Sequence, residues 1–136
     1  TVYGPRQRPE MAIHLFARLA SEGIAIPRFG SGESVRDYTY VADIVEGLIA
    51  AMENPCGYRV FNLGNDNPIS LNALITRLGQ ALGSSIRVDD HGDQPGDVPR
   101  TWACIDRAQQ ELGYTPAVPL EAGLERFVAW LKQSSV

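Results

Sequence analysis

Apolar residues at helical spacing, separated by residues that end helices, are the feature of this sequence that most constrains its fold. Within residues 41–52, apolar side chains recur at i, i+3, i+4, i+7, i+8 and i+11, which predicts an amphipathic helix. Residues 54–57, with a proline and a glycine, end it. A second helix is predicted over residues 71–82, where Ser70 is a suitable N-cap and Gly83 a suitable stop.

Three further helices are expected from the same signals. Pro9 suits the first position of a helix that Gly23 ends. Asp106 can cap a short helix that Gly113 ends, and apolar residues on one face predict a last helix over residues 120–131. With helices in most of the chain, the strands that remain must be short.

Short strands are predicted at residues 24–26, 60–63 and 86–88, with 60–63 as a buried one. Residues 1–5 have the pattern of a strand end that runs into a turn. A loop rich in glycine, proline and aspartate follows over residues 89–100. The sequence therefore predicts one small α/β domain, with about five helices, short strands and long polar loops.

Charge and composition exclude several functions. The net charge of -4 argues against a general nucleic-acid binder. No apolar run approaches the roughly 20 residues of a membrane span, and no secretory signal begins the chain. Cys56 and Cys104 stand far apart, and His14 and His91 show no ligand spacing, so neither a disulfide framework nor a metal site is expected. A cytoplasmic location is the expectation.

Motifs that carry oxidoreductase chemistry are missing. Residues 30–32 read Gly-Ser-Gly, but the third glycine of a dinucleotide fingerprint is absent and an extended segment follows instead of a helix. A Tyr-x-x-x-Lys pair is impossible, because Lys132 is the only lysine and Val128 precedes it by four residues. No Gly-x-Ser-x-Gly elbow supports a serine nucleophile. We therefore expect no catalytic, cofactor-binding or metal-binding residues in this chain.

Polar loops are better candidates for ligand binding. Residues 6–8 place two arginines before a predicted helix N-terminus, which favours an anion, although both can equally be solvated surface charges. Arg36 is expected to be held by the adjacent Asp37 and Tyr38, which is typical of a positioned phosphate ligand, and a structural ion pair gives the same pattern. The stiff turn at residues 94–99 names no ligand by itself.

A series of stretches in one order covers nearly the whole chain and matches one enzyme family. They are residues 1–5, 6–12, 29–32, 35–44, 61–64, 94–99, 112–116 and 120–124. Together they resemble the C-terminal region of extended short-chain dehydrogenases/reductases, specifically the NAD-dependent nucleotide-sugar epimerases and dehydratases. Residues 6–12 and 94–99 are most similar to the UDP-glucuronate 4-epimerase branch. Gln94, where UDP-galactose 4-epimerases more often carry arginine, and Cys104, where relatives usually have aspartate, depart from the pattern.

The resemblance implies a UDP-sugar site. The residues it places near the nucleotide are Pro27, Arg28 and Phe29 at the uracil, Arg36 at the diphosphate, and Tyr38, Ser70, Gln94 and Asp97 along the ligand. At the sugar end it places Thr1, Arg8 and Met11, with Arg8 as the candidate partner of a glucuronate carboxylate. Ser70 has a second expected role as a helix cap.

The resemblance also implies a division of labour. In such enzymes an N-terminal Rossmann domain, absent from residues 1–136, holds NAD and the Tyr-x-x-x-Lys pair, while the C-terminal domain grips UDP during oxidation and rotation of the sugar. A chain that starts at Thr1, inside an element, is expected to be part of a longer, homodimeric enzyme, and inactive alone. Two alternatives stay open: a dehydratase, decarboxylase or reductase with the same lobe, or a stand-alone nucleotide-binding module without catalysis.

Overall fold

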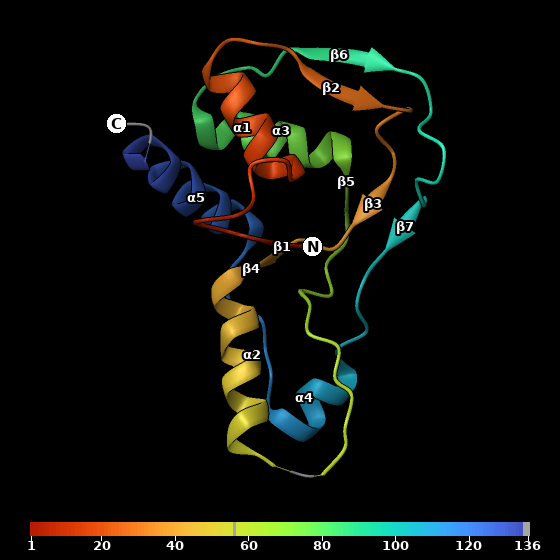
Figure 1. The fold of residues 1–136 in the computed structure, drawn as a ribbon, viewed down its shortest axis with the longest axis vertical. Helices are drawn as coiled ribbons and strands as arrows, with labels where there is room; N and C mark the ends of the chain where they lie inside the picture. The colour runs from red at the N-terminus through yellow and green to blue at the C-terminus, as the bar shows by residue number, and fades with distance from the viewer. Residues whose placement is uncertain (56, 135–136) are drawn as a thin grey trace.

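The computed structural model describes residues 1–55 and 57–134, so Cys56 lies outside the described residues. Within these ranges the chain has five helices and seven short strands (Figure 1). The helices are α1 (Ala12–Ser21), α2 (Val41–Glu53), α3 (Leu71–Leu82), α4 (Asp106–Leu112) and α5 (Leu120–Ser134). The strands are β1 (Val2–Tyr3), β2 (Ile26–Phe29), β3 (Val35–Arg36), β4 (Thr39–Tyr40), β5 (Ile69–Ser70), β6 (Val88–His91) and β7 (Arg100–Thr101). The predicted small α/β fold is confirmed.

The strands form three small sheets. β1 pairs with β4, and β2 with β6, both in parallel. In the third sheet β3 lies between β5, which is antiparallel to it, and β7, which is parallel. Arg36 therefore stands on a central strand, where ladder hydrogen bonds on both sides fix its backbone.

Most of the core lies between α1, α3 and α5, in the upper half of Figure 1. Its fully buried members include Tyr3, Ile13, Leu74, Leu124 and Phe127. A second, smaller cluster of Ile105, Ala108 and Tyr114 lies by α4, which runs beside α2 in the lower half of the figure. None of the helices in residues 1–55 and 57–134 combines the length and the hydropathy that crossing a bilayer requires.

Two buried carboxylates fasten the loops that run between these clusters. Asp37 accepts the backbone N–H groups of residues 65 and 66 at 3.0 and 3.1 Å. Asp43 accepts those of residues 117 and 118 at 3.0 and 3.2 Å. Charge-assisted hydrogen bonds of this kind are about twice as strong as neutral ones. The loops thus keep a defined course without regular secondary structure.

Three predicted helix ends that depend on a single residue are confirmed, at Ser70, Gly83 and Gly113. Ser70 caps α3, and its Oγ accepts the Ala73 N–H at 3.2 Å. Gly83 and Gly113 adopt the left-handed conformation, with φ of 73° and 67°, directly after α3 and α4. The predicted cap at Asp106 is wrong by one residue, because Ile105 occupies the N-cap position and Asp106 is the first helical residue.

The predicted start of the first helix at Pro9 is wrong. Residues 8–11 form a turn, in which the Met11 N–H bonds the Arg8 carbonyl at 3.1 Å. Met11 is extended, with φ -75° and ψ 143°, and α1 begins at Ala12. A proline suits a turn as well as a helix start, so its preference does not choose between them.

Strand positions were predicted less well than helices. The ladder between β2 and β6 runs from Ile26 opposite Val88 to Phe29 opposite His91. The strands predicted at residues 24–26 and 86–88 therefore include only the first pair of this ladder. The loop predicted over residues 89–100 contains most of β6 at its start and the first residue of β7 at its end. The buried strand predicted at residues 60–63 is wrong. That segment has no regular secondary structure, no described strand pairs with it, and Val60 is 59% exposed. A segment forms a strand only when another strand pairs with it, and the spacing of apolar residues does not reveal that partner.

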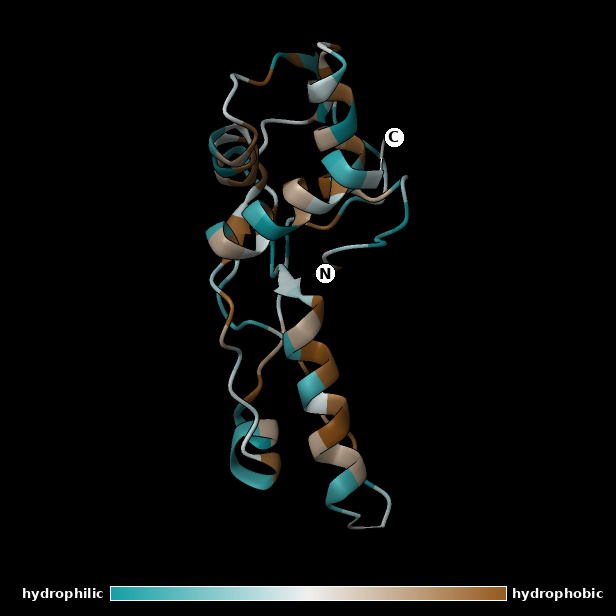
Figure 2. Cartoon of the chain, turned by 90° about the vertical axis from the view of Figure 1, so that its left-hand side faces the viewer, coloured by the Kyte–Doolittle hydropathy of each residue, from teal (hydrophilic) through white to brown (hydrophobic). Residues whose placement is uncertain are grey.

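The helix predicted over residues 41–52 is present as α2, but much of its apolar face is exposed. Val45, Leu48, Ile49 and Met52, at i, i+3, i+4 and i+7, are exposed, Met52 to 81%. The helix buries Asp43 and Gly47 instead. Figure 2 shows hydrophobic residues along much of α2, in the lower half of the view. A contiguous exposed apolar stripe is typical of an interaction surface.

Tyr114 predicts a loss of stability at high pH. Its hydroxyl donates to the Gly64 carbonyl at 2.9 Å, and burial, followed by Asp43 and Asp37, raises the pKa of Tyr114 to about 12. A group whose pKa is raised by folding stabilises the fold fully below its unfolded pKa and loses that contribution as the pH rises through its folded pKa. We expect the free energy of unfolding in urea to fall between about pH 10 and pH 12. Tyr114→Phe should show a smaller fall, and cost about 1 kcal/mol at pH 7 for its lost hydrogen bond. An equal fall in the variant would contradict this assignment.

Candidate functional site

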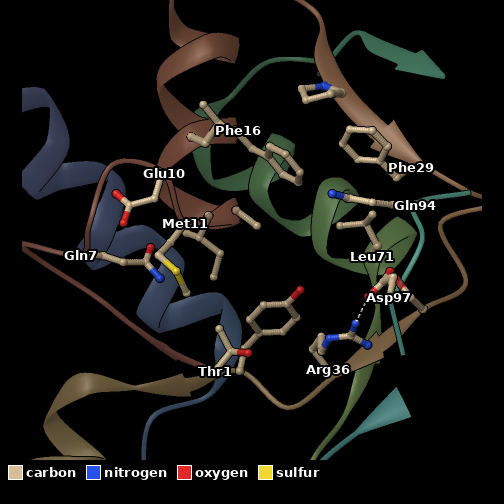
Figure 3. A pocket seen from close by; sticks show the side chains of 16 residues that line it. Thr1, Gln7, Glu10, Met11, Phe16, Phe29, Arg36, Leu71, Gln94 and Asp97 are labelled. Atoms are coloured by element: carbon tan, nitrogen blue, oxygen red, sulfur yellow. Dashed lines mark hydrogen bonds and ion pairs between the residues drawn. The ribbon is translucent and has the colours of Figure 1, made fainter. Parts of the chain in front are cut away.

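A cleft of about 390 Å³ collects residues from four distant parts of the chain (Figure 3). One wall is the N-terminal segment and α1, a second is β2, β3 and the residues after β3, and the rest is the start of α3 and the loop after β6. Its lining residues are Thr1, Gln7, Glu10, Met11, Ala12, Ile13, Leu15, Phe16, Pro27, Phe29, Ser34, Arg36, Tyr38, Leu71, Gln94 and Asp97. The cleft therefore brings together most of the predicted site residues.

One end of the cleft is mostly apolar. Phe16, Phe29 and Leu71 lie there, beside the Gln94 amide (Figure 3). Leu15 and Pro27 add apolar lining. The Phe29 ring is exposed on one side and lies 5.2 Å from the His91 ring, centroid to centroid, at 31°. Aromatic and branched side chains in this arrangement form a surface suited to a flat ring.

Arg36 supplies the positive charge of the cleft. Its Nη1 donates to the Val35 carbonyl at 2.9 Å, and its Nη2 pairs with the Asp97 carboxylate. The dashed line in Figure 3 marks the ion pair with Asp97, which comes from the loop after β6. A planar guanidinium with several donors can bind a phosphate through two of them. An anion in the cleft would meet a cation that its neighbours already orient.

Alternation along the extended chain explains which neighbours of Arg36 face the cleft. Arg36 and Tyr38 line it, while Asp37 between them bonds the backbone of residues 65 and 66 on the other side. The expectation that the adjacent Asp37 holds Arg36 is therefore replaced by the pairing with Asp97, 61 positions away. Burial raises the pKa of Tyr38, and the Arg36 charge opposes that rise.

Gln7 is a site residue that the sequence analysis missed. Its Nε2 donates to the Val2 carbonyl at 3.1 Å, while its Oε1 is buried and has no hydrogen-bond partner among the described residues. Gln7 lines the cleft beside Thr1, Glu10 and Met11. A buried acceptor without a donor costs about 1–3 kcal/mol, so a ligand hydroxyl here would be stabilised. Its position between Arg6 and Arg8 could have marked Gln7 as a candidate, but the sequence did not show that its side chain is directed into the cleft.

Two predicted arginines do not line the cleft. Arg8 is exposed, with 75% of its side chain accessible, and pairs with Glu10 at 3.3 Å. The Arg28 guanidinium donates from Nε to Asp90 at 2.7 Å and from Nη1 to Asn72 at 2.9 Å. Their ligand-binding roles stay predictions.

Ser70, also predicted at the nucleotide, is absent from the lining and serves α3 as its cap. Ser70→Ala is expected to lower the free energy of unfolding by about 1 kcal/mol, because an N-terminal N–H of the helix loses its acceptor. Ser70→Thr keeps an acceptor and should recover most of the loss. Urea unfolding measures both, and equal stability of Ser70→Ala and the wild type would show that the cap contributes nothing.

The turn at Gly30 and Gly32 does not fit the pyrophosphate of a dinucleotide cofactor. Gly30 and Gly32 lie in a turn that leads into β3, so no helix N-terminus follows them to receive a pyrophosphate. Among residues 1–55 and 57–134, no group of three or more His, Cys, Asp and Glu side chains is placed to hold a metal ion. The cleft combines apolar and aromatic side chains with the Arg36–Asp97 ion pair, an arrangement that suits an organic anion with a flat ring.

Residues 1–64 match the model of the NAD dependent epimerase/dehydratase family. The match covers 64 of the 136 residues, and this part of the chain is similar to that family. A UDP-glucuronate 4-epimerase of Thermodesulfobacterium geofontis is 40% identical over 98% of the chain and 42% of its own length. The structure is similar to that of Bacillus cereus UDP-glucuronic acid 4-epimerase in complex with UDP-glucuronic acid and NAD, with a TM-score of 0.93 and 37% identity over 98% of this chain and 43% of that one.

A dTDP-glucose 4,6-dehydratase of Bacillus anthracis in complex with NAD is also similar, with a TM-score of 0.90 and 25% identity over 98% of this chain and 42% of that one. The chain thus spans about two-fifths of the length of these relatives. The two structural comparisons each cover 98% of this chain, so the fold is shared throughout.

Proposed function

We propose that this chain is the UDP-sugar-binding part of an NAD-dependent nucleotide-sugar epimerase that interconverts UDP-glucuronate and its C4 epimer. The observation that carries the proposal is the order of groups along one cleft. An apolar surface with Phe29 lies at one end, Arg36 stands beside Asp97, and the unpaired Gln7 acceptor lies on the opposite wall (Figure 3). A base, a diphosphate and a sugar follow one another in the same order.

In this assignment each part of the ligand meets a group of matching chemistry. The uracil packs against Pro27 and Phe29, and the Arg36 guanidinium donates to the diphosphate. Asp97 accepts from a ribose hydroxyl, while Gln7 and Thr1 face the sugar. Arg8 reaches a glucuronate carboxylate only if its side chain leaves Glu10, 3.3 Å away. A firm hold on UDP keeps the sugar close while it turns within the site.

The same proposal assigns NAD and the Tyr-x-x-x-Lys pair to a Rossmann domain outside this chain. Support comes from the relatives, of which the chain spans about two-fifths, and from the turn at Gly30 and Gly32, which a strand and not a helix follows. The exposed stripe of Val45, Leu48, Ile49 and Met52 on α2 offers that domain an apolar surface. The longer enzyme is proposed to be a cytoplasmic homodimer.

Conversion of UDP-glucuronate tests the proposed function. The longer protein that carries this chain, supplied with NAD, should convert UDP-glucuronate into UDP-galacturonate, detected by the NMR signal of the proton at C4. The chain alone should leave the substrate unchanged. Epimerisation by the chain alone, or no reaction of the longer protein with any UDP-sugar, would overturn the proposal.

The similarity to a dTDP-glucose 4,6-dehydratase favours one second candidate, a dehydratase, decarboxylase or reductase with the same lobe. The lower identity, 25% against 37%, is the reason to rank it second. Loss of water or carbon dioxide from the nucleotide sugar in the same NMR assay would select it. A non-catalytic nucleotide-binding module would instead bind UDP and leave every sugar intact.

A further inference from the structure

The loop of residues 30–34 connects the two halves of the cleft. It starts after Phe29, at the apolar end, and leads into β3, which carries Arg36. Gly30 and Gly32 have φ of 62° and 75°, so both are in the left-handed region. Residues 30–34 belong to no strand, so no backbone ladder fixes them. Contacts with other parts of the chain must therefore set the path of this loop.

The Gly30 N–H bonds the His91 carbonyl at 3.2 Å and the Leu71 N–H bonds the Ser34 carbonyl at 3.0 Å, and between these two ends Asn72, in the first turn of α3, makes the contacts. Its backbone N–H donates to the Gly32 carbonyl at 3.0 Å. Its side-chain Nδ2 donates to the Ser31 carbonyl at 3.1 Å and to Glu33 Oε1 at 2.8 Å. The fit is close, because a Cβ added at Gly32 would lie 2.1 Å from Asn72 Oδ1.

The remaining polar atom of Asn72 ties the loop to the β2–β6 ladder. Its Oδ1 accepts from Arg28 Nη1 at 2.9 Å, and Arg28 Nε donates to Asp90 at 2.7 Å. Arg28 belongs to β2 and Asp90 to β6, where the two stand opposite each other. One amide therefore joins the loop, the helix α3 and the two-stranded ribbon that carries Phe29.

We propose that Asn72 is a positioning residue that holds residues 30–34 and so sets the separation of Phe29 and Arg36 for the ligand. A role in stabilising α3 is a weaker explanation, because Ser70 already caps that helix through Ala73. The side chain of Asn72 is directed at the loop and at Arg28, 39 to 44 positions away in the sequence. The claim that Asn72 prepares the cleft for UDP rests on the proposed function. The claim that Asn72 holds residues 30–34 does not.

Amide hydrogen exchange of the chain tests the hold on the loop directly. In Asn72→Ala, exchange of the amides that tie residues 30–34 to their surroundings should accelerate about tenfold, which corresponds to roughly 1.4 kcal/mol of local stability. These are the Gly30 N–H on the His91 carbonyl and the Leu71 N–H on the Ser34 carbonyl. The midpoint of global thermal unfolding should change by no more than a few degrees. Asn54→Ala is the matched control, because Asn54 also donates one side-chain bond, to the Ala50 carbonyl at 2.8 Å, but at the end of α2. That variant should leave exchange in the loop unchanged.

UDP binding to the same variants separates the two claims. If the wild-type chain binds UDP, Asn72→Ala should weaken binding about five- to tenfold and Asn54→Ala should not. Asn72→Asp keeps the acceptor for Arg28, loses both Nδ2 donations and sets a carboxylate against Glu33, so it should weaken binding as much as alanine. Unchanged loop exchange in Asn72→Ala overturns the inference. Faster exchange without any UDP binding to the wild type leaves Asn72 as the loop anchor and overturns the proposed function.

Discussion

Phe127→Ala is expected to lower the free energy of unfolding by about 3–5 kcal/mol, the range for removing a buried aromatic ring. Phe127 is fully buried between α5, α1 and α3. Its ring lies 5.6 Å from that of His14 and 5.7 Å from that of Trp130. The alanine leaves a cavity where three helices meet, and whole domains are stable by only about 5–15 kcal/mol. Urea unfolding followed by circular dichroism measures the change.

The matched control for this substitution is Phe29→Ala. Phe29 is 42% exposed at the cleft, so its removal should cost about 1 kcal/mol of stability or less. It should nevertheless weaken UDP binding, because the base loses its aromatic surface. Equal losses of stability in the two variants would show that the core does not centre on Phe127.

Arg36→Ala is expected to weaken UDP binding by about 1.5–3 kcal/mol, which is the range for hydrogen bonds to charged groups. Arg36 is the cation that lines the cleft, and its side chain is only 21% exposed. Loss of the guanidinium also leaves Asp97 unpaired, so a carboxylate then repels the diphosphate. Calorimetry with UDP and UDP-glucuronate on the longer protein measures the effect.

A second arginine provides the control for Arg36. Arg77 pairs with Glu121 at 3.2 Å and does not line the cleft, so Arg77→Ala should leave UDP affinity unchanged. Wild-type affinity in Arg36→Ala would remove Arg36 from the site.

Features that depend on one residue's own conformational preference were predictable from sequence. Ser70 at the start of α3 and the left-handed glycines after α3 and α4 are such cases, because the cap or the φ value is a property of that residue in its turn. Spacing also predicted all five helices. It did not show which side of α2 is buried, because that depends on the surface packed against the helix.

Features that depend on contacts far apart in the sequence were not predictable. Arg36 pairs with Asp97 rather than Asp37, because chain alternation turns Asp37 away and the loop after β6 returns to β3. Arg28 was expected at the uracil and is held by Asp90 and Asn72, which the pairing of β2 with β6 and the packing of α3 bring to it. Most of the residues that the resemblance named line one cleft, but the direction of their side chains came only from the structure.

A titration of the isotopically labelled chain with UDP, followed by amide NMR shifts, tests the central claim most directly. The account predicts shifts at Phe29, Arg36, Tyr38 and Asp97, with weak affinity on the order of 1 mM, or about 4 kcal/mol, for a ligand that this cleft holds alone. These shifts should be lost in Arg36→Ala and kept in Arg77→Ala. Shifts that avoid these four residues, or that persist unchanged in Arg36→Ala, would contradict a UDP site in this cleft.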